Sequence, residues 1–132
     1  MHPNTRWLCA FLFTQAVEVP IYTRALAGTR WARHALLIAF GASALTHPIV
    51  WFVTPHLWSD LYLALMAPHP ALQLSRFAHY VGMVMLAEAF AVAAETIYLG
   101  RFVPRRALVW ALSANAASVT LGLLSRAAFG LP

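Results

Sequence analysis

The sequence predicts an all-α integral membrane protein, folded as a four-helix bundle with a short interfacial helix, and three observations indicate this class. Of the 132 residues, 61% are hydrophobic and only 10% are charged. The few charges cluster between long apolar runs, as expected where lipid is the solvent. Four of these runs have the roughly 20 residues that a helix needs to cross about 30 Å of hydrocarbon. We therefore expect one transmembrane domain over residues 1–132.

The four predicted spans are separated by connectors that contain turn-forming or basic residues. The spans cover residues 7–27, 35–53, 77–100 and 107–128. The connector between the second and third spans is long and contains several prolines. Within it, Leu57, Leu61 and Leu65 recur at helical spacing, which predicts the short helix at the membrane interface.

The first apolar run has some features of a secretory signal peptide, because Arg6 precedes it. However, Gln15, Glu18 and Pro20 interrupt the stretch in which a signal peptide needs an unbroken apolar core. We expect this run to be a membrane span.

The basic residues predict the orientation of the chain. All nine are arginines, and the formal net charge is +5. Six lie in or beside the first and third connectors: Arg24, Arg30, Arg33, Arg101, Arg105 and Arg106. By the positive-inside rule these connectors face the cytoplasm, so we expect both termini on the non-cytoplasmic side of a bacterial cytoplasmic membrane. No basic stripe with interleaved aromatic residues is present, so we expect no nucleic-acid partner.

The acidic residues are the strongest indication of function. The chain has four, and three of them, Glu18, Glu88 and Glu95, lie within predicted spans, whereas Asp60 lies in the long connector. A charged side chain at the centre of the bilayer costs about 2.5 to 3.5 kcal/mol on insertion scales, so such residues normally face the bundle interior and have a partner. Three together indicate an intramembrane site.

Helical spacing gives each predicted span one polar or small face, so the four faces can converge. From these faces we predict a cation site with the ligands Glu18, His47, Glu88 and Asn115. Glu88 and His47 are also the candidate catalytic residues. Around them we place Gln15, Tyr22, Glu95 and Ser118.

No arginine lies deep enough in a predicted span to neutralise these carboxyl groups, which leaves three alternatives open. One or more glutamates can be protonated and share hydrogen bonds. A divalent transition metal such as zinc or iron can bind an imidazole, two carboxylates and an amide oxygen. The acids can instead relay protons or bind a cationic substrate.

Three functions follow from these alternatives. The first is a cation-binding membrane protein, which with a metal would be a metal-assisted enzyme. The second is a small proton- or cation-coupled transporter. The third is an accessory subunit whose buried polar groups only fix helix packing. Besides the lipid bilayer, we expect a second copy of the chain or a larger membrane complex as partner, because 132 residues bury little surface on their own.

Overall fold

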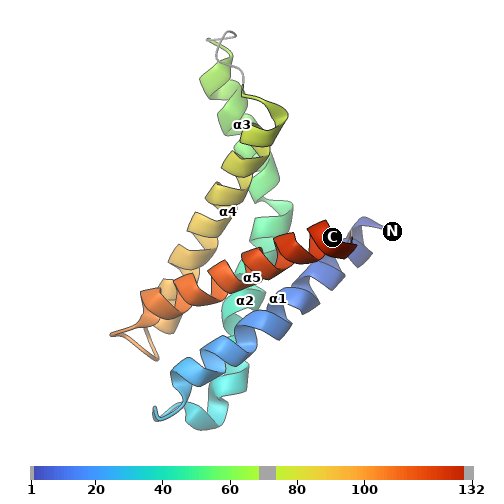
Figure 1. Ribbon diagram of the computed structural model, residues 1–132. Helices are drawn as coiled ribbons and strands as arrows, with labels where there is room; N and C mark the ends of the chain where they lie inside the picture. The colour runs from blue at the N-terminus through green and yellow to red at the C-terminus, as the bar shows by residue number, and fades with distance from the viewer. Residues whose placement is uncertain (1, 69–73, 130–132) are drawn as a thin grey trace.

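The computed structural model describes residues 2–68 and 74–129, and within them it is helical without any strand (Figure 1). This confirms the all-α prediction. The elements are α1 (Pro3–Leu26), the short 3₁₀ helix η1 (Ala32–His34), α2 (Ala35–Phe52), α3 (Thr54–Met66), α4 (Arg76–Leu99) and α5 (Ala107–Phe129). The four longest helices coincide closely with the four ranges predicted from the apolar runs.

Three segments are long and apolar enough to cross a membrane. They are Ala32–Phe52, Arg76–Leu99 and Ala107–Phe129. Helix α1 has a sufficient length of 24 residues, but it does not belong to this group. It carries Arg6, Gln15 and Glu18 among its apolar residues, and such groups lower the hydropathy of a helix.

The long helices pack in a closed order in which each contacts two others. Helix α1 packs against α2, α2 against α4, α4 against α5, and α5 against α1. Neighbours in this ring include segments far apart in sequence, since α1 and α5 open and close the chain. Side chains from all four helices therefore face a common interior.

The tightest part of this interior lies toward the end where short connectors join α1 to α2 and α4 to α5. Tyr22, Leu26 and Leu99 are fully buried there. Tyr22 and Leu99 pack among alanines, whose small side chains allow helices to approach closely: Ala39, Ala42, Ala107 and Ala114. Leu26 packs beside them with Ala35 and Ile38. The two connectors also touch each other, because the rings of Trp31 and Phe102 meet edge to face at 5.3 Å.

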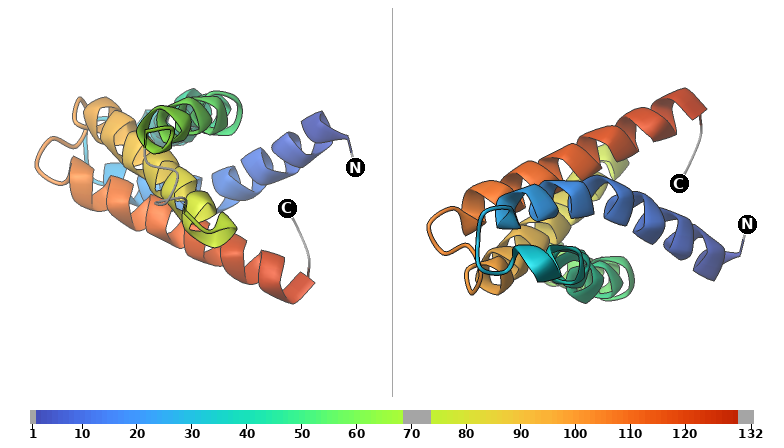
Figure 2. Two further views of the ribbon diagram at one scale, coloured as in Figure 1. Left: turned by 90° about the horizontal axis from the view of Figure 1, so that it is seen from above. Right: turned by 90° about the horizontal axis from the view of Figure 1, so that it is seen from below.

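Glycine and proline residues shape α1 at its end and in its middle. Gly28 follows the helix with φ of +80°, a conformation that other residues rarely adopt, so α1 ends here. Pro20 lies inside α1 and cannot donate the usual backbone hydrogen bond. Figure 2 shows α1 changing direction in its middle, so that its first half diverges from the last half of α5. The ring of helices is therefore close at the connector end and open at the other.

Helix α3 occupies the region for which an interfacial helix was predicted, although residues 69–73 of that connector lie outside the described residues. Its helical hydrogen bonds follow directly from α2, since Leu57 N donates to Val53 O at 3.1 Å. Helix α3 thus runs on from α2 and packs beside the first part of α4 (Figure 1). Trp58 holds this contact, with its Nε1 donating to His79 Nδ1 at 3.3 Å.

Gly82 provides the space on α4 for the ring of Trp58, which leads to a test of the α3–α4 contact. A Cβ atom at Gly82 would lie 2.4 Å from Trp58 Cζ2, whereas at Gly122 the nearest atom, on Phe13, is 3.8 Å away. We expect Gly82→Ala to destabilise the protein by about 1 to 3 kcal/mol, the usual range for overpacking. Thermal unfolding in detergent measures this change. Gly122→Ala is the matched control, and an equal effect of both substitutions would contradict the packing.

Candidate functional site

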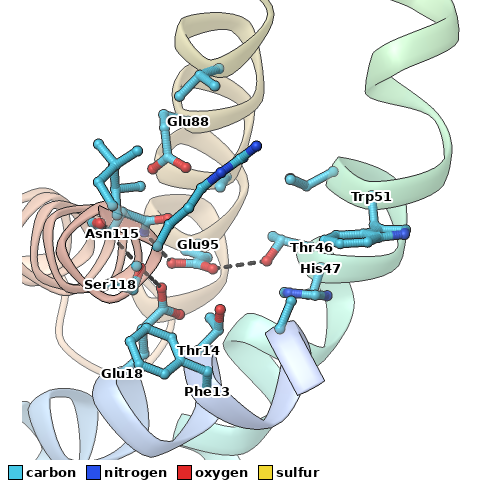
Figure 3. A pocket seen from close by; sticks show the side chains of 18 of the residues that line it. Phe13, Thr14, Glu18, Thr46, His47, Trp51, Glu88, Glu95, Asn115 and Ser118 are labelled. Atoms are coloured by element: carbon cyan, nitrogen blue, oxygen red, sulfur yellow. Dashed lines mark hydrogen bonds between the residues drawn. The ribbon is translucent and has the colours of Figure 1, made fainter. Parts of the chain in front are cut away.

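The carboxyl group of Glu95 lies at the centre of the polar interior. Glu95 is on α4, and it accepts hydrogen bonds from the three other long helices. Figure 3 shows the bond from Thr46. Tyr22 of α1 donates through its phenol. Thr46 Oγ1 of α2 lies 2.8 Å from Oε1, and Asn115 Nδ2 of α5 lies 2.6 Å from Oε2. Glu95 is 1% exposed, so one buried carboxyl group links all four long helices.

A second carboxyl group, that of Glu18 on α1, is bound in a similar way. Ser43 of α2 donates to its Oε2. Ser118 of α5 donates to its Oε1 at 2.7 Å. Glu18 is 2% exposed. Together with Glu95 it fixes how α1, α2 and α5 are placed relative to one another.

The hydrogen-bond donors recorded for these two carboxyl groups are hydroxyls and one amide, all of them neutral. Neutral donors hold a carboxylate in place but do not cancel its charge. An ionised carboxylate removed from water is costly unless a proton or a counter-charge accompanies it. Two such groups in one interior therefore call for a proton or another cation.

A cavity of about 710 Å³ opens beside these residues. Glu18, Glu88, Glu95, Asn115 and Ser118 all line it, and Figure 3 shows the side chains of the three glutamates gathered around one space. Glu88 is only half-buried, and it takes part in none of the hydrogen bonds that hold the other two carboxyl groups. It is the carboxyl group most available to a ligand.

His47 lines the same cavity from α2 but has an aromatic environment. Its ring lies edge-on to Phe11 at 5.3 Å, stacks at 6.2 Å on Trp51, and lies 6.2 Å from Trp7. Its Nδ1 is buried and has no hydrogen-bond partner in the part of the chain that the structure describes. His47 is thus part of the cavity wall, separate from the carboxyl–hydroxyl network.

The structure brings together most of the residues predicted for the site. Glu18, Tyr22, Glu95, Asn115 and Ser118 belong to the network, and Glu88 and His47 line its cavity. Gln15 is buried near the network, but neither polar atom of its side chain has a partner among the described residues. The assignment of Glu18, His47, Glu88 and Asn115 as metal ligands, and of Glu88 and His47 as catalytic groups, stays a prediction.

The arrangement around a metal ion receives no support from the geometry. Within residues 2–68 and 74–129, no three side chains of the histidine, cysteine, aspartate and glutamate types are grouped so that they could hold one ion. Glu18 and Asn115 already bond to neighbouring hydroxyl and carboxyl groups, and His47 packs among aromatic rings.

Two residues of the network, Ser43 and Thr46, were not among the predicted site residues. They are three apart on α2 and belong to its buried face. Two hydroxyl residues three apart lie on one face of a helix, and this spacing could have indicated that both face the interior. Hydroxyl groups are common in membrane helices, however, and many bond only to their own backbone.

Comparisons with protein-family models, with curated proteins and with solved structures found no match to this chain.

The triple acceptor role of Glu95 leads to a prediction about stability. In Glu95→Ala, the Tyr22 hydroxyl loses its acceptor, while Thr46 and Asn115 keep their bonds to Ser43 O and Ala111 O. A buried unpaired donor costs about 1 to 3 kcal/mol, so we expect the free energy of unfolding to fall by at least about that much, measured by denaturation in mixed micelles. Ile97→Ala, at a position on the same helix that is 70% exposed, is the control. A loss no larger than that of Ile97→Ala would show that the network does not hold the helices together.

Proposed function

We propose that this protein is a small four-span membrane protein that binds a cation between its helices, with a proton and an organic ammonium group as the two cations concerned. The observation that carries this proposal is the position of Glu18, Glu88 and Glu95 on one cavity, with neutral groups as the hydrogen-bond partners of the two deeper acids. Three negative charges so placed repel one another and attract a positive charge.

The three carboxyl groups have different roles in this proposal. Glu18 and Glu95 are held in place by hydroxyl and amide groups, and because a buried carboxylate needs a proton or a nearby cation, they favour positive charge in the cavity. Glu88 faces the same space without such restraint and is the group that takes up the cation. Because one carboxylate can hold either a proton or an ammonium group, the two compete. This competition is the chemistry of a proton-coupled carrier, and it favours the transporter among the predicted functions.

The membrane topology that we propose adds α1 to the three apolar segments. Its polar residues Gln15 and Glu18 are buried against other helices, so lipid meets mainly its apolar side. The first half of α1 and the last half of α5 lie at the same end of the molecule (Figure 1), as an even number of spans requires. With the arginine-rich connectors in the cytoplasm, both termini face outward from a bacterial cytoplasmic membrane.

Helix α3, running on from α2, would reach the outer interface of that membrane. Its leucines Leu57, Leu61 and Leu65 are exposed, and together with other exposed apolar side chains on the long helices they suit lipid or a second copy of the chain.

A second candidate is a structural role, which the bonding of Glu95 to three helices supports. Here the carboxyl groups would only fix the positions of the helices. Glu88 separates the two candidates, because it does not take part in that bonding but does line the cavity.

Tetraphenylphosphonium is a suitable probe for the cation site because it is a permanent organic cation. We expect purified wild-type protein to bind it at neutral pH, and Glu88→Gln to weaken binding by at least about tenfold, the effect of losing one charged partner worth about 1.4 kcal/mol. Binding should also weaken as the pH falls, because protons compete for Glu88. Equilibrium dialysis of the detergent-solubilised protein measures both effects.

Asp60→Asn is the matched control for that experiment. It also removes one carboxylate, but from an exposed position on α3 that does not line the cavity. Unchanged binding in Glu88→Gln would contradict the cation site and leave the structural role.

The proposed orientation is tested by reporter fusion. We expect alkaline phosphatase fused after the last residue to be active, because this enzyme needs the oxidising space outside the cytoplasm to form its disulfides. A fusion within the connector at Arg105 should be inactive. An active fusion at Arg105 together with an inactive fusion after the last residue would show the opposite orientation.

A further inference from the structure

The cavity that holds the carboxyl groups at one end has two arginines at the other. Arg6 comes from the start of α1 and Arg126 from the last turns of α5, and both line the cavity while remaining exposed. The guanidinium carbon of Arg126 lies 6.0 Å from the centre of the Tyr80 ring on α4. Arg6 and Arg126 therefore border the open end, where α1 and α5 diverge (Figure 2).

The two signs of charge are separated along the helices. On α5, Asn115 beside the deep carboxyl groups and Arg126 at the open end are eleven residues apart, which is about 16 Å of helix. On α4, Tyr80 beside Arg126 and Glu88 are eight residues apart, or about 12 Å. One cavity thus offers positive groups at its mouth and a free carboxylate about two turns deeper.

Apolar side chains form the walls between these charged ends. Phe13, Val119 and Leu123 line the cavity where α1 and α5 separate. A second cavity of about 310 Å³ is lined mainly by apolar residues of α2, α3 and α4. The residues that it shares with the first are Val50, Trp51, Val84 and Glu88. A ligand at Glu88 would therefore have apolar surface on several sides.

We propose that the ligand of this cavity is a zwitterionic amphiphile, a lipid that carries a phosphate next to an ammonium group. The inference rests on the proposed cation site and adds to it the anionic half and the chains. The phosphate binds Arg6 and Arg126, which suit it because guanidinium groups donate paired hydrogen bonds to phosphate oxygens. The ammonium group binds Glu88.

The acyl chains of such a lipid leave between the first half of α1 and the last half of α5. Phe13 on α1 and Leu123 on α5 line the cavity there and are themselves partly exposed, so the apolar wall continues to the surface on both helices. A lipid that lacks the ammonium group would satisfy the arginines but leave Glu88 without a partner. A simple cation would bind Glu88 but leave the two arginines without a partner.

Native mass spectrometry of the full chain in detergent tests this proposal with a mixture of three dioleoyl lipids. Phosphatidylethanolamine carries both charges, phosphatidylglycerol only the phosphate, and a trimethylammonium-propane lipid only the cation. We expect the first to be retained most strongly. The double variant Arg6→Gln/Arg126→Gln should lower its retention by at least about tenfold, and Glu88→Gln should abolish the preference over phosphatidylglycerol.

The control is Arg101→Gln/Arg105→Gln, which removes two exposed arginines at the connector end, away from the cavity. It should leave the lipid preference unchanged, and an equal loss in this variant would overturn the assignment to Arg6 and Arg126. Soluble phosphoethanolamine should compete only weakly. Full competition by it would overturn the role of the acyl chains.

The outcomes also separate this inference from the cation site on which it rests. If the trimethylammonium lipid binds in a Glu88-dependent way while the Arg6/Arg126 variant retains all three lipids as the wild type does, the cation site stands. The proposal of a zwitterionic ligand is then wrong. If Glu88→Gln changes no lipid while the arginine variant lowers both phosphate lipids alike, the cation site itself is contradicted.

Discussion

The structure depends on one buried interaction, the acceptance of three hydrogen bonds by the carboxyl group of Glu95. The donors Tyr22, Thr46 and Asn115 come from α1, α2 and α5, and Glu95 itself is on α4. In an apolar environment such bonds cannot be replaced by water, so the four helices are restrained at one level. From Glu95 toward the connector end, small residues let the helices approach closely. Toward the other end, α1 and α5 diverge. The cavity exists because α1 and α5 are close to each other near the connector end only.

Much of the fold could be predicted from the sequence, because apolar runs and the glycine and proline residues that end helices depend only on neighbouring residues. The apolar runs and the connectors with Gly28 or Pro104 place the ends of the long helices within a few residues of where the structure has them. The path of α3 could not be predicted in this way. It depends on backbone hydrogen bonds that continue past Val53 and on the fit of Trp58 to Gly82, which only the folded chain brings together. Membrane crossing is indicated by composition for three segments, and for α1 it depends on which side chains are buried.

For the site, helical spacing indicated that polar faces of the four long helices can converge, but not which residues lie at the same height along the helices. Glu88 and Glu95 are seven residues apart and therefore share a face of α4, so periodicity cannot tell which of them reaches the network. The level is set by how far the small-residue core lets the helices slide, which is a property of packing. For the same reason His47, on the correct side of α2, lies among Phe11 and Trp51 and outside the hydrogen-bonded network. The placing of α1 beside α5, which puts Arg6 and Arg126 on one cavity, is a consequence of the tertiary fold.

Glu88 has a different role from the other two glutamates in the proposed function, and the small number of glutamates in the chain allows a direct test. The sequence contains only three glutamates, so protein labelled with carbon-13 at the glutamate carboxyls gives three signals, and Glu88→Gln identifies one of them. Solid-state NMR of the protein in bilayers would follow these signals as tetraphenylphosphonium is added. We expect the Glu88 signal to shift while those of Glu18 and Glu95, held by their hydrogen bonds, change much less. An unchanged Glu88 signal, or equal shifts of all three, would contradict cation binding at Glu88.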